Sequence, residues 1–282
     1  MTSDTTESRN RRWFVTGASS GLGRALVERV LAEGDTVVAT ARNRLVLKDL
    51  ESRYPNTLEV EALDVRDLTA ISTTVGRIVR TGPVDIAVNN AGYGVVGAAE
   101  EFTEQQIDDQ LRTLLYGPIA ITRAFLPLMR RQRGGHIIQM SSFCGQAVFP
   151  GASIYSAAKW GLEAFSESVA LEVKGFGINI TIVEPGGQRT GFAEALDFAT
   201  PLAAYHEGPV ADFCRIAGAE DSYTGDPAKV ASRIVEATRM SEPPLRLVVG
   251  DDAYIAIHGA LRDRLRALSK DRESSGPIPD AI

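Results

Sequence analysis

The chain has 282 residues, 44% hydrophobic and 23% charged, which is ordinary for a globular protein and allows a substantial core. Its net charge of −6 without a long basic run argues against nucleic-acid binding, and no apolar run approaches the roughly 20 residues that cross a bilayer. With two cysteines and no signal-peptide pattern, we expect a cytoplasmic protein with no disulfide framework and no membrane contact.

Short β-branched runs alternate with longer amphipathic stretches along the chain. The predicted strands are 13–16, 36–40, 58–63, 85–88, 136–140, 179–183 and 245–249. The predicted helices lie near 22–33, 43–53, 67–80, 103–131, 153–175, 226–240 and 252–269, with Asp67, Thr103 and Asp226 as caps. Several strands are apolar nearly throughout, as in a parallel sheet covered on both faces. The pattern therefore predicts one α/β domain, a doubly wound and mainly parallel sheet with helices on both faces.

Three parts of the chain depart from this alternation. Residues 1–11 and about 271–282 are predicted to be flexible tails. The three arginines Arg9, Arg11 and Arg12 are predicted to be solvated. Residues 187–225 follow the sixth strand, and their composition predicts a long irregular segment. A disordered loop is the alternative for this segment. Because it carries several large apolar side chains, we expect it instead to form a substrate-binding lid.

A glycine-rich turn, Thr16-Gly-Ala-Ser-Ser-Gly-Leu-Gly23, joins the first predicted strand to the first helix. Glycine lets backbone N–H groups approach a phosphate, and the helix N-terminus places partial positive charge there. A tight structural turn is the alternative, but the position between strand and helix predicts a dinucleotide site. The residues that we expect to hold the dinucleotide here are Gly17, Ser19, Ser20, Gly21, Leu22 and Gly23.

The second predicted strand ends in Ala39-Thr-Ala-Arg42, without the acidic residue that commonly binds the ribose 2′-hydroxyl of NAD. A guanidinium at this place suits a 2′-phosphate, so the sequence favours NADP(H), with NAD(H) possible. A solvated strand-end arginine is the alternative.

The ends of the next two strands complete the adenosine side of the expected cleft. Ligands of such sheets bind beyond the carboxyl ends of the strands. The residues predicted here are Asp64 and Val65, after the third strand, and Asn90, Ala91 and Gly92, after the fourth.

Tyr155 and Lys159 are spaced by four residues and lie one turn apart on one face of a predicted helix. An ammonium beside a phenol favours the tyrosinate, which predicts a Tyr155 pKa below the usual value of about 10. Such a tyrosine can exchange a proton with an alcohol or a ketone at neutral pH. A solvated surface pair is the alternative for this spacing alone. Ser142, upstream of the pair, makes the catalytic interpretation stronger.

Together these motifs resemble those of the single-domain short-chain dehydrogenases/reductases, over about residues 12–260. The matching signatures are Thr16-Gly-x-x-x-Gly-x-Gly23, Asn89-Asn-Ala-Gly92, Ser142, Tyr155-x-x-x-Lys159 and Pro185-Gly-x-x-x-Thr190. The resemblance implies a Rossmann-type sheet of seven strands in the order 3-2-1-4-5-6-7. It also implies hydride transfer at the nicotinamide C4, and a homodimer or homotetramer formed through the fourth and fifth helices.

The resemblance also implies roles for residues at the nicotinamide end. Tyr155 would be the acid/base, Ser142 would orient the substrate oxygen, and Lys159 would hold the nicotinamide ribose and tune Tyr155. The residues implied to hold the rest of the nicotinamide group are Pro185, Gly186, Gln188 and Thr190. Cys144 and Phe192 are expected in the substrate pocket, Cys144 as lining because no histidine partner for a nucleophilic thiol is evident.

One position departs from the family pattern. Relatives carry Asn-x-x-Gly on the fourth helix, where the asparagine helps to anchor a water of the proton relay, and this chain has Leu114-Leu-Tyr-Gly117. Because leucine cannot hydrogen-bond, we expect the proton supply of this protein to differ from that of its relatives.

The sequence therefore predicts an NADP(H)-dependent oxidoreductase of the ketoreductase type, interconverting a ketone or aldehyde with an alcohol on an apolar small molecule. A non-catalytic NADP(H)-binding redox sensor is one alternative, and an epimerase or dehydratase of the wider superfamily is another. The three histidines are dispersed along the chain, so no metal site is expected.

Overall fold

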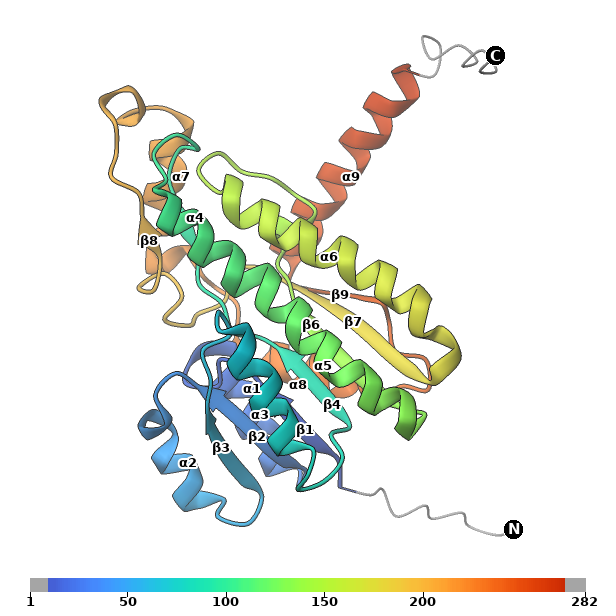
Figure 1. Ribbon diagram of the computed structural model, residues 1–282. Helices are drawn as coiled ribbons and strands as arrows, with labels where there is room; N and C mark the ends of the chain where they lie inside the picture. Colours follow the sequence, from blue (N-terminus) through green and yellow to red (C-terminus); the bar gives the residue numbers. More distant parts are fainter. Residues whose placement is uncertain (1–9, 272–282) are drawn as a thin grey trace.

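The computed structural model describes residues 10–271, which form a seven-stranded parallel sheet between two layers of helices (Figure 1). Across the sheet, the strands are β3 (Leu58–Ala62), β2 (Thr36–Ala41), β1 (Arg12–Val15), β4 (Ile86–Asn89), β6 (Gly135–Met140), β7 (Ile178–Pro185) and β9 (Arg246–Val249). All seven predicted strands are present in the predicted order. Two additional short strands, β5 (Val95–Val96) and β8 (Asp197–Phe198), pair with each other outside this sheet.

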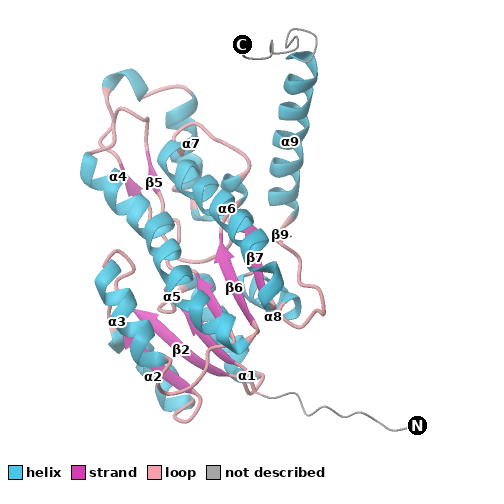
Figure 2. Ribbon diagram, turned by 45° about the vertical axis from the view of Figure 1, so that its right-hand side comes forward, coloured by secondary structure: helices cyan, strands magenta, loops and turns pink. Residues whose placement is uncertain are grey.

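Helices cover both faces of the sheet, as the alternating pattern predicts (Figure 2). The helices are α1 (Gly21–Ala32), α2 (Lys48–Arg53), α3 (Leu68–Ile78), α4 (Glu104–Leu111), α5 (Gly117–Gln132), α6 (Ser153–Val173), α7 (Pro209–Ala217), α8 (Pro227–Ala237) and α9 (Asp251–Asp271). The three predicted caps accept hydrogen bonds from the first turns of α3, α4 and α8, and Thr103 forms a capping box with Gln106.

Two apolar clusters, one on each face of the main sheet, make up most of the core, and a small third cluster contains Val95, Phe102 and Ala199. Trp13 and Phe14 are neighbours in β1, and because side chains alternate along a strand they enter different clusters. Trp13 packs on the side of α1 and α8, whereas Phe14 packs on the side of α3, α5 and α6. The ring of Phe14 lies 5.0 Å from that of Phe125 of α5, between ring centroids. Because every pairing in this sheet is parallel, the carboxyl ends of its strands all lie at one edge of the domain.

The long helix predicted over 103–131 is interrupted. Between α4 and α5, residues Arg112–Tyr116 form a π-helical segment, in which Leu114 is 1% exposed. Single π-helical turns inside α-helices occur frequently at functional sites. The apolar periodicity of the sequence does not reveal this change of winding, because the α- and π-helical turns bury the same face.

The prediction of a flexible amino-terminal tail is wrong for Arg11, and the prediction of solvated arginines is wrong for both Arg11 and Arg12. Arg11 donates its backbone N–H to Asp35 at 2.9 Å and its Nη1 to the carbonyl oxygen of Thr238 at 2.9 Å. Arg12 begins β1 and donates to Glu59 at 2.9 Å. Both arginines are ordered because carboxylates lie at the amino-terminal edge of the sheet. The other predicted tail residues, 1–9 and 272–282, lie outside the described part of the chain.

Residues 187–225 are more regular than their composition predicts, since they contain β8 and α7. The two ends of the segment are joined by hydrogen bonds, from Gly225 N–H to Gly187 O and from Arg189 N–H to Gly225 O, each 2.9 Å. The segment therefore begins and ends at adjacent positions, as a compact loop does. Its mobility as a lid stays a prediction.

We predict that Phe125→Ala lowers the free energy of unfolding by about 3–5 kcal/mol, since a fully buried ring is replaced by a cavity. Urea denaturation followed by circular dichroism measures this change. The control is Leu171→Ala, whose side chain is 79% exposed, with an expected change within about 0.5 kcal/mol. Similar losses in the two variants would contradict this assignment of the core.

Candidate active site

A cavity of about 680 Å³ lies where the strands of the main sheet end at their carboxyl termini. Every residue predicted for the site lines this cavity, with the exception of Gly23. These residues are Gly17, Ser19, Ser20, Gly21, Leu22, Arg42, Asp64, Val65, Asn90, Ala91, Gly92, Ser142, Cys144, Tyr155, Lys159, Pro185, Gly186, Gln188, Thr190 and Phe192. Segments that are distant in the sequence therefore meet at one edge of the sheet, as parallel strands require.

The glycine-rich turn is shaped by close backbone approaches. Gly17 and Gly21 have φ angles of +66° and +56°, in the region that favours glycine. A Cβ atom on Gly17 would lie 2.6 Å from the Cα of Ala91. Gly23 lies behind the turn, where a Cβ would stand 2.3 Å from the carbonyl oxygen of Gly17, so its role is packing rather than lining.

The Asn-Ala-Gly motif after β4 holds this turn in place. The Asn90 amide donates to the carbonyl oxygens of Thr16 at 2.9 Å and Gly17 at 3.1 Å. In return, the Thr16 hydroxyl accepts hydrogen bonds from the backbone N–H groups of Asn90 and Ala91, at 2.9 and 3.1 Å. These bonds couple the ends of β1 and β4. The side chain of Ser20 does not cap α1, so the backbone N–H groups at the start of this helix are available to a phosphate.

At the far end of the cavity, Arg42 is exposed and follows the neutral Ala41. Asp64 is held by Arg66, whose Nη2 donates to it at 2.8 Å, and this hydrogen bond lowers the pKa of Asp64. Arg66 also bonds Asp109 at 2.8 Å. Sequence reasoning missed Arg66, because an arginine two residues after an acid carries no distinctive signal.

Tyr155 and Lys159 both face the cavity from α6, and Ser142 faces it from the end of β6. The Lys159 ammonium lies 5.7 Å from the centroid of the Tyr155 ring. It donates to the backbone carbonyl oxygen of Met140 at 2.7 Å, and the lysine is 5% exposed. The Ser142 hydroxyl accepts a hydrogen bond from the Cys144 N–H at 3.2 Å, which fixes it beside the tyrosine.

The predicted lowering of the Tyr155 pKa is wrong for this structure. Burial raises the pKa of Tyr155 above its usual value, and a hydrogen bond from Ser142 opposes this only in part. Burial also lowers the pKa of Lys159, to about 8. Because the lysine releases its proton before the buried phenol ionises, its charge is no longer present to favour the tyrosinate. Tyr155 is therefore a protonated phenol at neutral pH.

Apolar side chains enclose the end of the cavity beside Tyr155. The ring of Phe192 makes edge contacts with Tyr155 and Tyr223, with centroids 6.3 and 6.4 Å apart. Cys144 is buried, and burial raises the pKa of its thiol to about 12, so it is uncharged lining. Phe213, one of the large apolar side chains of the predicted lid, also lines the cavity. Residues 187–225 contribute further lining that was not singled out from the sequence: Leu196, Ile216, Ala217 and Tyr223. The only signal for them is the aromatic and aliphatic content of this segment.

Asp252, at the start of α9, is another lining residue that sequence reasoning missed. Its carboxylate accepts a hydrogen bond from the Gly187 N–H at 2.7 Å. A Cβ on Gly186 would lie 2.0 Å from the same carboxylate, so glycine is required for this approach. Asp252 thereby fixes the turn after β7, where Pro185 also lines the cavity.

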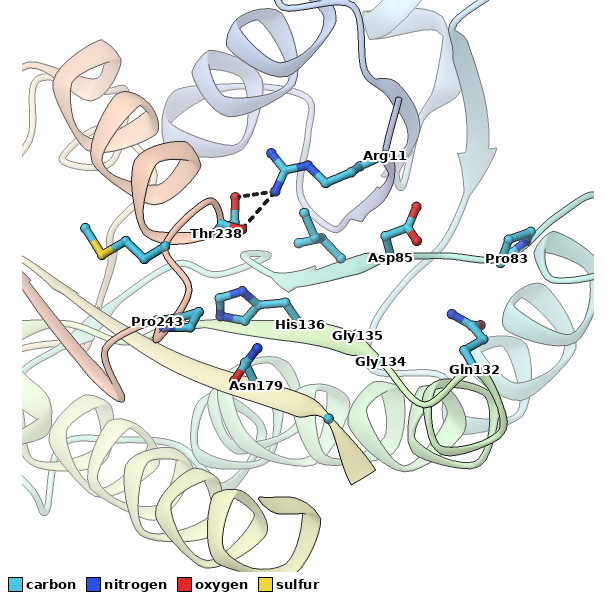
Figure 3. A pocket seen from close by; sticks show the side chains of 13 residues that line it. Arg11, Pro83, Asp85, Gln132, Gly134, Gly135, His136, Asn179, Thr238 and Pro243 are labelled. Atoms are coloured by element: carbon cyan, nitrogen blue, oxygen red, sulfur yellow. Dashed lines mark hydrogen bonds between the residues drawn. The ribbon is translucent and has the colours of Figure 1, made fainter. Parts of the chain in front are cut away.

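A second cavity, of about 480 Å³, lies at the opposite edge of the sheet, near the amino-terminal ends of β4, β6 and β7 (Figure 3). Arg11 is bonded to Thr238 there, and burial lowers the pKa of His136 to about 4, which keeps the imidazole neutral. None of the sequence motifs reaches this cavity. Within residues 10–271 no cluster of three potential metal ligands is found, and no helix is long and apolar enough to span a membrane.

Comparisons with known proteins agree with this geometry. The short chain dehydrogenase family model matches residues 11–199. The chain is 37% identical to oxidoreductase BOA17 of Botryotinia fuckeliana, over 86% of this chain and 89% of the relative. It is 32% identical to a 3-ketodihydrosphingosine reductase of Bacteroides thetaiotaomicron, over 84% and 87%. The crystal structure of a short-chain dehydrogenase from Streptomyces avermitilis matches with a TM-score of 0.90 and 41% identity, covering 95% of this chain and 98% of the other.

We predict that Gly23→Ala destabilises the protein by about 1–3 kcal/mol, because the new methyl group overlaps the Gly17 carbonyl oxygen and the Asn90 amide. Urea denaturation without ligand measures the change. The matched control is Gly76→Ala in α3, where a Cβ meets no atom within 4 Å, so that this variant keeps or gains stability. Equal stability of the two variants would show that the turn is not packed as described.

Proposed function

This chain belongs to the short-chain dehydrogenase family, and we propose that it is an NADP(H)-dependent oxidoreductase interconverting a ketone or aldehyde with an alcohol. One observation carries the proposal: Tyr155, Lys159 and Ser142 converge on one wall of the cavity that the glycine-rich turn opens. Proton-transfer groups and a phosphate-binding turn are thus combined in a single site.

The cavity fits a nicotinamide dinucleotide. Gly17 and Gly21 leave room that side chains would fill, and within residues 10–271 no side chain caps the start of α1, so its first N–H groups could bind a phosphate. When bound, the nicotinamide group would supply or accept a hydride. Among the described residues Arg42 makes no salt bridge, so its guanidinium is available to a 2′-phosphate, which supports NADP(H) over NAD(H).

In the proposed reaction Tyr155 is the acid/base. Because its phenol is protonated at neutral pH, it is suited to give a proton to the oxygen of a carbonyl as the alcohol forms. Ser142 would orient that oxygen from the end of β6. Lys159 would hold the nicotinamide ribose and, with its pKa near 8, is a reservoir from which the phenol regains its proton.

Leu114 lines the same cavity, so an apolar side chain stands where relatives carry an asparagine. We propose that Tyr155 is reprotonated through Lys159 or directly by solvent. The same leucine favours the second candidate function, a non-catalytic redox sensor that binds NADP(H). Against the sensor, the three groups needed for proton transfer are all present and share one wall of the cavity.

The proposed substrate is an apolar carbonyl compound or alcohol, because Phe192, Leu196, Phe213 and Ile216 line the cavity near Tyr155. The relative that is named as a 3-ketodihydrosphingosine reductase supports a ketone as substrate. Residues 187–225 would order over such a substrate and exclude water. A homodimer or homotetramer, and a cytoplasmic location, are proposed on the family resemblance.

We predict that Tyr155→Phe lowers turnover by roughly 10²–10⁴-fold while the Kd for NADPH changes little, because the variant removes a proton donor and keeps the ring. A panel of apolar ketones, followed through nicotinamide absorbance, measures turnover. Lys159→Ala should impair both turnover and NADPH binding. Near-normal turnover by Tyr155→Phe would exclude the proposed mechanism.

We predict that the protein binds NADPH more tightly than NADH, and that Arg42→Ala weakens NADPH binding about 10- to 100-fold, since a charge-assisted contact contributes roughly 1.5–3 kcal/mol. Affinity for NADH should stay unchanged, which makes it the internal control. Titrations of both cofactors against both proteins measure the effect. If the wild type binds NADH as tightly as NADPH, the assignment of Arg42 is incorrect.

A further inference from the structure

A buried carboxylate lies one helical turn beyond Lys159 on α6. Glu163 is 2% exposed, and both of its oxygens are hydrogen-bonded. The Ser141 hydroxyl donates to Oε1 at 2.5 Å, and the Nη1 of Arg246 donates to Oε2 at 2.7 Å. The guanidinium makes the second of these bonds charge-assisted, and such bonds are stronger than neutral ones. Glu163 therefore joins three elements behind the site: the end of β6, helix α6 and strand β9.

The glycine of the turn after Ser142 makes room for this carboxylate. A Cβ on Gly145 would lie 1.8 Å from Oε1 of Glu163 and 2.7 Å from the hydroxyl of Ser141. The short 3₁₀ turn that carries Cys144 thus packs directly against the Ser141–Glu163 hydrogen bond. Movement of the carboxylate would disturb the turn that places Ser142 and Cys144.

A second buried acid shares the same arginine. Glu184 of β7 accepts hydrogen bonds from Arg246 Nη1 and from Gln146 Nε2, both at 2.5 Å, and its Oε2 has no partner among the described residues. Burial, and then the nearby Glu163, raise the pKa of Glu184. Arg246 also bonds Glu167, which is half exposed, so its charge is divided among three acids.

Few charged groups act on Lys159. Tyr155 on α6 and Cys144 in η3 (Phe143–Gly145) are both protonated at neutral pH. The backbone of β6 contributes only the carbonyl oxygen of Met140. Within the described residues, Glu163 is the one carboxylate that raises the pKa of Lys159, and burial is the larger effect that lowers it. Arg246 of β9 donates to Glu163 and to Glu184 of β7, so it links these two acids; neither Arg246 nor Glu184 is bonded to Lys159 among the described residues.

We propose that Glu163 is a positioning residue of this site, which keeps Lys159 in its charged form and holds the Ser141–Ser142 strand end against helix α6. The inference rests on the proposed function, because it assigns the charged lysine to cofactor binding. If Glu163 is neutralised, Lys159 should lose its proton at a lower pH. The affinity for an anionic nucleotide should then begin to fall at that lower pH.

The test is the affinity for NADPH between pH 6 and pH 10, followed by nicotinamide fluorescence, which requires no turnover. For Glu163→Gln we expect the loss of affinity with rising pH to begin about one pH unit below that of the wild type. Glu167→Gln is the matched control, since it lies on the same helix and bonds the same arginine but is 47% exposed; its curve should coincide with the wild type. Glu163→Asp should restore most of the wild-type curve, and Lys159→Met should remove this titration.

Circular dichroism establishes that each variant is folded. If Glu163→Gln does not fold, Glu163→Asp serves as the test variant, because it keeps the hydrogen-bonding groups but withdraws the carboxylate from Lys159 by one methylene; a smaller shift in the same direction is expected. A folded Glu163→Gln variant whose curve coincides with the wild type or, where only Glu163→Asp folds, a Glu163→Asp variant without a shift, overturns the inference while the proposed function stands. A wild type that binds no NADPH at any pH overturns both.

Discussion

The burial of the Lys159 ammonium is the constraint on which the rest of the site depends. A charged group inside a protein is costly unless acceptors and opposite charge surround it. Here the carbonyl oxygen of Met140 accepts its hydrogen bond, and Glu163 supplies the negative charge one turn away. These contacts tie helix α6 to the end of β6, and so set the distance between Tyr155 and Ser142.

The cavity has two chemically different ends, which the parallel sheet brings together. Around the glycine-rich turn, the wall is formed mainly by glycines and serines, and the reciprocal hydrogen bonds of Thr16 and Asn90 hold the turn in place. Beside Tyr155 the wall is apolar, with Phe192 and Tyr223 in contact across it. In the proposed function, a polar cofactor and an apolar substrate would meet at this tyrosine, as hydride transfer requires.

Much of the fold was predictable, because apolar strands and capped helices are local signals. The strand runs and the caps Asp67, Thr103 and Asp226 were visible in the sequence. The π-helical break at Leu114 was not, since it preserves the buried face of the helix.

The positions of the site motifs followed from parallel topology, but the electrostatics did not. The sign of the Tyr155 pKa shift depends on burial, which no spacing reveals, and the link between Asp252 and the turn after β7 joins residues 65 apart.

Transfer of deuterium from NADPH labelled at C4 of the nicotinamide tests the central claim most directly. The wild-type protein would be incubated with each of the two C4 epimers of the labelled cofactor and an apolar ketone, and the alcohol analysed by mass spectrometry and NMR. The account predicts that one epimer delivers its deuterium to the carbinol carbon and that Tyr155→Phe nearly abolishes the transfer. Tight binding of NADPH without any deuterium in the product, across the ketone panel, would contradict it and favour the sensor.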